Sequence, residues 1–324
     1  MLRILKLVAA VVVVAGAALS IGWYVLADRL GDAIDGVEAA SAARGAESKC
    51  EGRDIFGFPL ALKVECSSWT MAAPELHLHS GPAGFSAPLY RPGHAEFVLS
   101  GPLDIAPTGL PPLSADWEMA TGSIDAWTDG IDTMVFELTA ARVSPRDATD
   151  GISPLARSAQ TDLRVARDGG NLVVEGAMDD LVLALDGTAS PAVDLSADAV
   201  LDGASGLLGP DGTGRGLRGR AGAVRLARLA LDGGDGAIEL AGPFRISQEG
   251  LLSATLELRL DHPDAIASAV ETSFPPLASL AGNLASTVQL VGQQQGDVIV
   301  MPLTIRNGFA AIGLIPLGRI PPLG

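Results

Sequence analysis

Polar and apolar residues alternate along much of the chain after residue 50, and this period of two constrains the fold more than any other feature of the sequence. The alternation is clear in residues 74–79, 95–99 and 135–140. Because successive side chains of a β-strand point to opposite faces, the pattern predicts strands with one apolar and one polar face. Short turn sequences separate such runs: Asp168-Gly169-Gly170, Gln248-Glu249-Gly250 and Asn307-Gly308. Connections this short join antiparallel neighbours, so we predict a mainly β fold of curved antiparallel sheets.

The composition agrees with this fold and narrows the choice of partners. Hydrophobic residues make up 48% of the 324 residues, which is enough to bury a core, and 39 glycines and 21 prolines supply the turns. The formal net charge of -16 argues against a nucleic-acid partner, because nucleic-acid binding rests on Lys and Arg side chains that neutralise phosphates. We interpret the acidic surface mainly as a source of solubility.

An uncharged run, residues 7–26, lies near the N-terminus and is long enough to cross a bilayer as a helix. Arg3 and Lys6 precede the run, and Trp23-Tyr24 lie near its far end, where interfacial aromatic residues are common. We predict that residues 1–27 are a single-pass anchor in the inner membrane of a double-membrane bacterium, with the body in the periplasm. A cleaved signal peptide is the alternative, because small residues suited to a cleavage site lie in the same region.

Helices are predicted at three further places. Residues 28–48 carry apolar side chains at helical spacing, which indicates a short stem helix that continues out of the membrane. Residues 261–272 have a capping Asp and an early Pro, and residues 275–291 begin with prolines and continue with leucines at helical spacing. We expect these two late helices to cover one end or one face of the sheet.

The sharpest break in composition is a Gly-rich stretch, residues 203–222. Glycine-rich segments favour loops and connectors over strands. We therefore predict that this stretch joins a first β subdomain, residues 49–202, to a second β subdomain, residues 223–324, which contains the two late helices.

Both cysteines of the chain flank one predicted turn. If the chain turns at Gly57-Phe58-Pro59, the flanking strands place Cys50 opposite Cys66, at a separation that a disulfide spans. We predict this disulfide, worth about 3 kcal/mol in the chain-entropy model, and with it an oxidising compartment. Redox catalysis is the alternative, but a buried bridge lacks the exposed thiolate that such chemistry needs. The same register separates an apolar face from a charged one: Phe56, Leu60, Leu62 and Val64 against Glu51, Arg53, Lys63 and Glu65.

A glycine-rich pattern in residues 214–219 matches the G-x-G-x-x-G sequence of dinucleotide-binding loops. A strand-like segment follows it, whereas a nucleotide site needs a helix N-terminus there, so we predict no nucleotide cofactor. Arg215, Arg218 and Arg220 nevertheless form a basic spot on an acidic chain. They are candidate contacts for anionic headgroups or an acidic partner; the alternative is a solvated loop with local ion pairs.

A second candidate for site chemistry is the segment with Glu75, His77 and His79, which would share one face of a strand. A zinc site needs further ligands from elsewhere, and the remaining histidines, His94 and His262, lie in no ligand pattern. We therefore interpret the three residues as solvent-facing. The sequence contains no G-x-S-x-G, H-E-x-x-H, P-loop or C-x-x-C motif, so we predict no metal, no cofactor and no enzymatic activity.

Several motifs together resemble the uncharacterised envelope family called domain of unknown function 2125. That resemblance implies no catalytic residues. The strand-rich pattern is more distantly similar to AsmA-like envelope proteins, whose long curved sheets are linked to lipid handling and outer-membrane assembly. The motifs are the N-terminal apolar segment, Ile55-Phe56-Gly57-Phe58-Pro59 between the two cysteines, Gly101-Pro102-Leu103, and Asn307-Gly308 followed by Ile320-Pro321-Pro322-Leu323.

The alternating strands, the abundant aliphatic residues and the anchor together favour a non-enzymatic function. We predict that an apolar sheet face binds lipid or another hydrophobic ligand in envelope biogenesis. The first alternative is a scaffold or assembly factor that binds another envelope protein through a sheet edge or the stem helix. The second is a hydrolase of envelope polymers, which would need a pocket with convergent acids.

Overall fold

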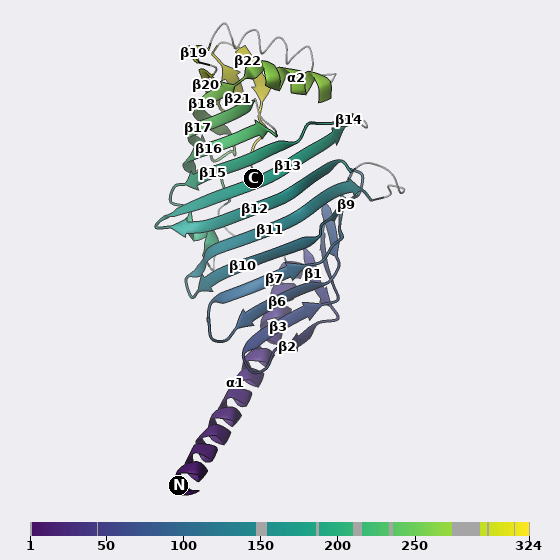
Figure 1. Ribbon diagram of the computed structural model, residues 1–324, viewed down its shortest axis with the longest axis vertical. Helices are drawn as coiled ribbons and strands as arrows, with labels where there is room; N and C mark the ends of the chain where they lie inside the picture. Colours follow the sequence, from purple (N-terminus) through teal and green to yellow (C-terminus); the bar gives the residue numbers. More distant parts are fainter. Residues whose placement is uncertain are drawn as a thin grey trace. The chain divides into compact units, whose positions relative to one another are not determined.

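The chain divides into two compact units, each described by itself below. The first unit comprises Met1–Ser123 and Pro145–Asp147, and the second comprises Ile124–Ser144 and Ala148–Gly324. Antiparallel strands dominate both units, which confirms the predicted mainly β fold (Figure 1). The computed structural model describes residues 2–43, 45–146, 154–185, 188–209, 216–232, 236–273, 292–296, 298–313 and 315–323, with the side chains of 2–13, 15, 18, 37 and 185 left out.

The first unit consists of a long helix followed by two antiparallel series of strands. One series pairs β1 with β4, β4 with β5, β5 with β8 and β8 with β9. The other pairs β2 with β3, β3 with β6 and β6 with β7. The element bounds are α1 Leu2–Ala43, β1 Glu47–Glu51, β2 Asp54–Phe56, β3 Ala61–Cys66, β4 Ser68–Ala73, β5 Leu76–Ser80, β6 Ala83–Pro88, β7 His94–Leu99, β8 Leu103–Pro107 and β9 Leu113–Asp116, with β10 Met119–Trp127 shared between the units.

Helix α1 runs without interruption through the predicted anchor and most of the predicted stem, residues 28–48. It ends at Ala43, before the predicted end of the stem, because the chain becomes extended as β1 from Glu47. Among the residues whose side chains are described, no helix combines the length and apolarity needed to cross a membrane. Residues 7–13 of the predicted anchor lie outside those residues.

The predicted turn at Gly57-Phe58-Pro59 is present, but the register of its hairpin differs from the prediction. β2 and β3 pair with Ile55 opposite Val64 and Phe56 opposite Lys63. An odd shift in register moves every side chain of a strand to the other face. Phe56 therefore lies on the charged face, where the Lys63 ammonium sits 5.9 Å from the centre of its ring, and Ile55 takes the apolar face.

Cys50 does not belong to this hairpin, which is a second correction to the predicted arrangement. It lies on β1, where its neighbour across the ladder is Trp69 of β4, while Cys66 ends β3. The reason is an extra turn at Gly52, which adopts a left-handed φ of 61° and separates β1 from β2. The two cysteines thus come from different strand series of the first unit.

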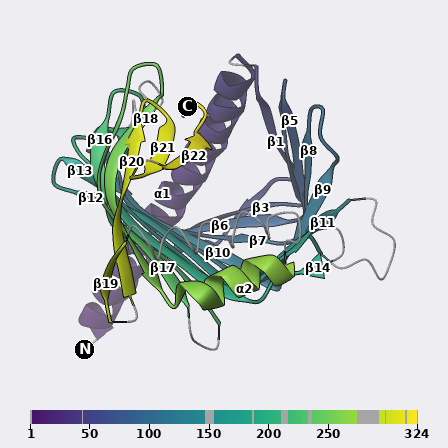
Figure 2. The ribbon, with the colours of Figure 1, turned by 90° about the horizontal axis from the view of Figure 1, so that it is seen from above.

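The second unit is a long antiparallel series in which strands mostly pair with their neighbours in sequence. The order is β11, β12, β13, β15, β16, β17, β18, β20, β21 and β22, with β14 on β13 and β19 on β20. Figure 2 shows the strands of this unit following a curved path. The bounds are β11 Gly130–Pro145, β12 Ala156–Asp168, β13 Asn171–Leu185, β14 Thr188–Ala189, β15 Val193–Leu201, η1 Ser205–Leu208, β16 Ala221–Leu231, β17 Ala237–Ile246, β18 Leu252–Asp261, α2 Pro263–Ser273, β19 Gln293–Gln295, β20 Val298–Arg306, β21 Phe309–Ile312 and β22 Ile315–Arg319.

The predicted hairpin turns of the second unit are confirmed. Gly169-Gly170 joins β12 to β13, since Asp168 pairs with Asn171. Asn307 and Gly308, with φ angles of 49° and 82°, join β20 to β21 in the left-handed geometry that a two-residue hairpin requires.

The Gly-rich stretch, residues 203–222, does not separate the two compact units. The strands on either side of it, β15 and β16, pair with each other from Val193–Leu231 to Leu201–Gly222. The stretch therefore connects two paired strands inside the second unit and ends within β16, which differs from the predicted subdomain boundary. Of the two predicted late helices, α2 is confirmed, and residues 275–291 lie outside the described residues.

Gly222 on β16 offers a test of this strand packing. A methyl group at Gly222 would overlap the carbonyl oxygen of Val200 and come within 2.9 Å of the Phe244 ring, whereas at Gly176 the nearest atom is 3.6 Å away. We expect Gly222→Ala to lower the free energy of unfolding by about 1–3 kcal/mol. Gly176→Ala, the matched control on β13, should be neutral or slightly stabilising. Urea unfolding of both variants measures the difference, and equal midpoints would contradict the register of β16.

Candidate functional site

Two adjacent rows of apolar side chains cross the sheet of the second unit on one face. Each row is made of residues that are direct neighbours in the strand ladders, and the two rows lie two residues apart on every strand. Residues two apart on a strand share a face, so the rows form one continuous apolar surface. The first row is Phe136, Leu163, Gly176, Ala197, Ala227, Leu240, Leu258 and Met301; the second is Leu138, Thr161, Met178, Leu195, Leu229, Ile238, Leu260 and Ile299.

The row between these two points to the opposite face and is mostly charged or polar. It runs through Glu137, Asp162, Ala177, Ser196, Arg228, Glu239 and Arg259. Some neighbouring strands carry opposite charges on this face: Arg228 lies 3.4 Å from Glu239, and Arg164 lies 2.8 Å from Glu175. Such cross-strand ion pairs suit a solvated face, so the two faces of the sheet have distinct chemistry.

One part of the apolar face is covered by the unit itself. Leu258, Leu260, Ile299 and Met301 form a buried cluster, against which Ile266 of α2 packs. The part on β11 to β17 is open, and Leu163 and Met178 remain 38% and 39% exposed. An open apolar sheet surface beside a closed core is the main candidate for a binding site in this unit.

A hollow of about 680 Å³ lies over this open part. Its floor is low at Gly176, Ala197 and Ala227, which are neighbours on β13, β15 and β16. Longer side chains border the floor, among them Met178, Leu195 and Leu229. The full lining is Phe136, Thr161, Asp162, Leu163, Gly176, Ala177, Met178, Leu195, Ser196, Ala197, Ala227, Arg228, Leu229, Ile238 and Leu240.

Gly176 contributes to this hollow without being required by the backbone. Its φ is not left-handed, and a methyl group there would make only ordinary van der Waals contacts. Glycine in the interior of a strand costs conformational entropy and often marks a place where another molecule approaches closely. Neither the backbone conformation nor the neighbouring atoms therefore require glycine at this position of the hollow.

A second apolar hollow, of about 440 Å³, lies in the first unit between α1 and the strands. The helix contributes Leu30 and Ile34, and the strands contribute Leu62, Val64 and Phe85. The disulfide also lines this hollow. It is smaller than the hollow of the second unit and is bounded on one side by the helix.

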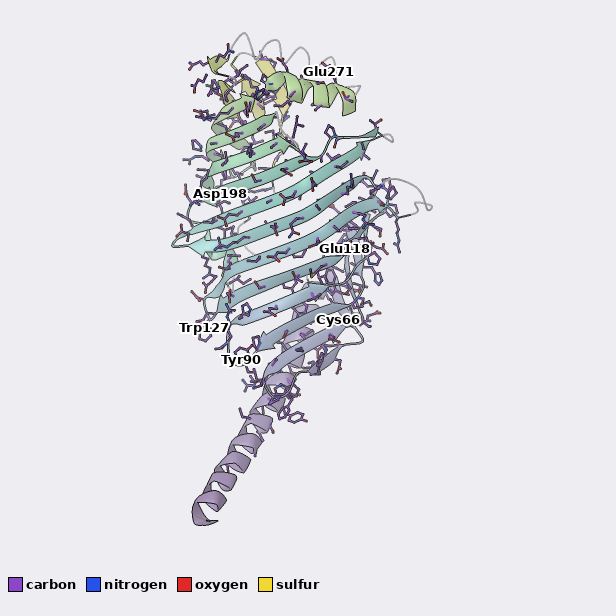
Figure 3. The ribbon with its side chains drawn as sticks, in the orientation of Figure 1. Cys66, Tyr90, Glu118, Trp127, Asp198 and Glu271 are labelled. Atoms are coloured by element: carbon purple, nitrogen blue, oxygen red, sulfur yellow. A yellow bond between two sulfur atoms is a disulfide. The ribbon has the colours of Figure 1, made fainter. Side chains whose placement is uncertain are left out.

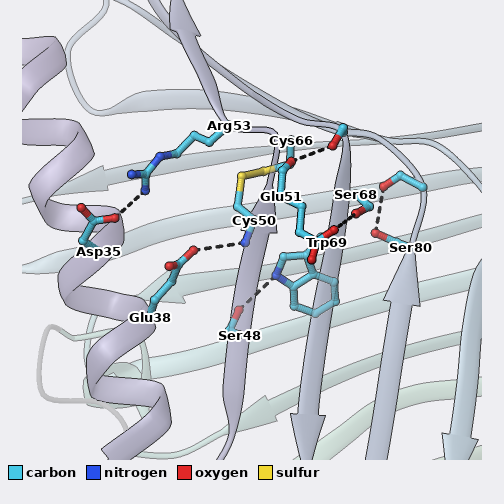
Figure 4. The surroundings of a disulfide bond; sticks show 12 residues. Asp35, Glu38, Ser48, Cys50, Glu51, Arg53, Cys66, Ser68, Trp69 and Ser80 are labelled. Atoms are coloured by element: carbon cyan, nitrogen blue, oxygen red, sulfur yellow. Dashed lines mark hydrogen bonds and ion pairs between the residues drawn. A yellow bond between two sulfur atoms is a disulfide. The ribbon is translucent and has the colours of Figure 1, made fainter.

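The predicted disulfide between Cys50 and Cys66 is confirmed, with its Cα atoms 5.3 Å apart. Figure 4 shows polar contacts from α1 to Cys50 on β1 and to Arg53, which lies between β1 and β2. The backbone N–H of Cys50 donates to Glu38 at 3.1 Å, and Arg53 lies 2.8 Å from Asp35. The hydrogen bond to Asp35 raises the pKa of the Arg53 guanidinium, so the guanidinium stays charged at any physiological pH.

The predicted basic spot is only partly described. Arg215 lies outside the described residues. Arg220 donates hydrogen bonds to the carbonyl oxygens of Gly216 at 3.0 Å and Gly203 at 3.1 Å, so it holds its own loop together. Arg218 is exposed. A contact of these arginines with headgroups or an acidic partner stays a prediction.

The segment with Glu75, His77 and His79 lies in and beside β5, and all three side chains are exposed, as expected for solvent-facing residues. Among the described residues, no group of three or more His, Cys, Asp or Glu side chains is placed to hold a metal ion.

The sequence predicted that an apolar sheet face binds a ligand, but not which residues form that face. The alternation indicated which side chains of each strand share a face, but not which strands are neighbours. The signal in the sequence was the repetition of small residues at apolar-face positions of successive strands: Gly176, Ala197 and Ala227.

Comparison with known proteins identifies the family of the chain but no activity. A family model described as "Uncharacterized protein conserved in bacteria (DUF2125)" matches residues 23–321. No curated protein matches the chain. No solved structure matches it either. The first resemblance seen in the motifs is thus confirmed, and the more distant similarity to AsmA-like proteins stays a prediction.

Proposed function

Because the chain belongs to the DUF2125 family, whose description assigns no activity, we propose a function from the geometry of the second unit. The open apolar face of β11 to β17 binds the hydrocarbon part of a lipid or a similar hydrophobic ligand. The protein acts without catalysis, as a membrane-anchored carrier or holder of that ligand in envelope biogenesis.

The observation that carries this proposal is the contrast between the two faces of one sheet. The charged face carries cross-strand ion pairs, whereas the apolar face leaves Leu163 and Met178 more than a third exposed over a hollow of about 680 Å³. Each methylene that leaves water for such a surface contributes about 0.8 kcal/mol. A chain of ten methylenes would gain roughly 8 kcal/mol before the cost of association is subtracted.

The proposal includes a membrane anchor in residues 7–26 with the body in the periplasm. The uncharged run supports the anchor, and Arg3 and Lys6 support an N-terminus in the cytoplasm. The disulfide supports an oxidising compartment for the body, since such bonds persist in the periplasm.

The hydrolase alternative fits this hollow less well. Hydrolysis of a polymer by acid and base needs at least two convergent acids. Asp162 is the one carboxylate among the described lining residues, and its strand position directs it to the charged face.

A photo-crosslinking residue on each face of β12 tests the proposal. Benzoylphenylalanine in place of Leu163 should give a lipid-sized mass adduct after irradiation of membranes that contain the full chain. The same residue in place of Arg164, the next position and the opposite face, should give none. Protein adducts at position 163 would instead favour the alternative in which the chain is a scaffold for another envelope protein.

A further inference from the structure

We propose that the β2–β3 turn, residues 57–60, and the β6–β7 turn, residues 89–93, rest in the headgroup layer of a lipid bilayer beside α1. We call this surface the collar. The inference rests on the proposed membrane anchor and adds a second contact between the protein and the membrane.

Trp23 joins the collar to the helix. Its indole Nε1–H donates a hydrogen bond to the carbonyl oxygen of Ala61 at 2.8 Å. Its ring meets Phe58 edge to face at a centroid distance of 5.8 Å, and Tyr24 in the same way at 5.3 Å. Trp23 itself is buried, so the β2–β3 turn is fixed against α1 at this height of the helix.

The β6–β7 turn lies beside the β2–β3 turn, because the backbone N–H of Leu89 donates to the carbonyl oxygen of Leu60 at 2.8 Å. The β2–β3 turn carries no charged residue, and Arg91 is the one charged residue of the β6–β7 turn. Figure 3 labels Tyr90 in this region of the first unit. The exposed side chains are large and apolar or aromatic: Tyr24 68%, Phe58 51%, Leu60 65%, Leu89 36% and Tyr90 79%.

A bilayer interface is the partner that fits this surface and its place on the helix. Tyr24 is two residues from the end of the uncharged run at residue 26, and a helix rises 1.5 Å per residue. The collar therefore lies beside α1, within a few ångströms of the point where the proposed anchor leaves the hydrocarbon. Aromatic rings with a polar group, such as Trp and Tyr, prefer this interfacial layer.

The collar also determines where the hollow of the first unit opens. Leu30, which lines that hollow, lies four residues beyond residue 26 on the same helix, or about 6 Å along its axis. A collar in the headgroup layer thus brings this hollow to the membrane surface, where an acyl chain can reach it.

Fluorescence quenching by lipids with brominated acyl chains tests the collar in the full chain. Leu60→Trp and Leu110→Trp form a matched pair, since the two leucines are 65% and 67% exposed in turns. Leu110 lies in the turn after β8, where Pro107 pairs with Leu76 of β5. The strand ladders place this turn at the end of the strands where β1 begins, just after α1 ends. That end is twenty residues, or about 30 Å, further along α1 than Trp23.

In phosphatidylcholine vesicles containing these lipids, the added fluorescence of Leu60→Trp should be quenched at least severalfold more than that of Leu110→Trp. Tyr90→Trp, a conservative change in the other turn, should behave like Leu60→Trp. Flotation of the same vesicles reports the anchor separately. If the chain floats but all three variants are quenched alike, the collar is refuted while the anchor stands. If the chain does not float, the anchor and the collar both fail.

Discussion

Loss of the disulfide, through Cys50→Ala together with Cys66→Ala, is expected to lower the free energy of unfolding by about 3 kcal/mol. The bond closes a sequence separation of 16 residues, and in the chain-entropy model it restricts the unfolded chain by about that amount. It also joins β1, from one strand series of the first unit, to β3, from the other. Urea unfolding of the variant and the unchanged protein measures the effect.

A reductant provides the control for this expectation. It should shift the unfolding midpoint of the unchanged protein toward that of the double variant and leave the variant unaffected. Equal midpoints for the oxidised protein and the variant would contradict a structural role of the bond. The hydrogen bond from Cys50 to Glu38 uses the backbone N–H and survives the substitution, so α1 keeps this contact with β1.

Ala197→Trp is expected to remove most of the bound lipid by filling the floor of the hollow in the second unit. Ala197 is exposed and lies between Gly176 and Ala227, so a large ring there occupies ligand space without displacing core side chains. If the ring excludes three methylenes of a chain, binding weakens by about 2.4 kcal/mol, or roughly fiftyfold. The fraction of protein that retains lipid in native mass spectrometry measures this loss.

Ser196→Trp is the matched control, because Ser196 is also exposed and is the next residue of β15. Ser196 borders the hollow, but the alternation of the strand directs its side chain to the charged face. It adds the same ring to the same strand and should leave the lipid-bound fraction unchanged. An equal loss of bound lipid in both variants would mean that the added ring disturbs β15 itself and does not act by filling the hollow.

The strands and turns of this fold were largely predictable from local sequence. The Asn307-Gly308 hairpin follows from the left-handed conformation that these two residues accept at low cost, and α2 follows from Pro263 at its first position, whereas Asp261, the predicted cap, ends β18. Both features depend on residues that are close in sequence, which is why pattern reasoning found them.

The register around the cysteines was not predictable in the same way. The symmetric spacing about Gly57-Phe58-Pro59 favoured a single hairpin, but the left-handed turn at Gly52 ends β1 and sends Cys50 to a ladder with Trp69. That partner comes from a later strand, so the choice depends on non-local packing. The disulfide itself was correctly predicted, because two cysteines in one short segment can meet in either arrangement.

An apolar sheet face was predicted as the binding surface, but the residues that form it were not, for the same reason. Alternation places Leu195 and Ala197 on one face of their strand, but the hollow exists only because Gly176 and Ala227 line up with Ala197 on the neighbouring strands. Nothing in the residues next to Ala197 indicates that alignment. These three residues share one property that the sequence does show: each is a small residue at an apolar position of its strand.

The most direct test of the proposed function is native mass spectrometry of the full chain after gentle extraction from membranes. The open apolar face predicts a population whose mass exceeds that of the protein by one lipid, and predicts that this population is lost in Ala197→Trp and kept in Ser196→Trp. A chain that appears only at its own mass, with no lipid adduct in the unchanged protein, would contradict lipid binding by this face.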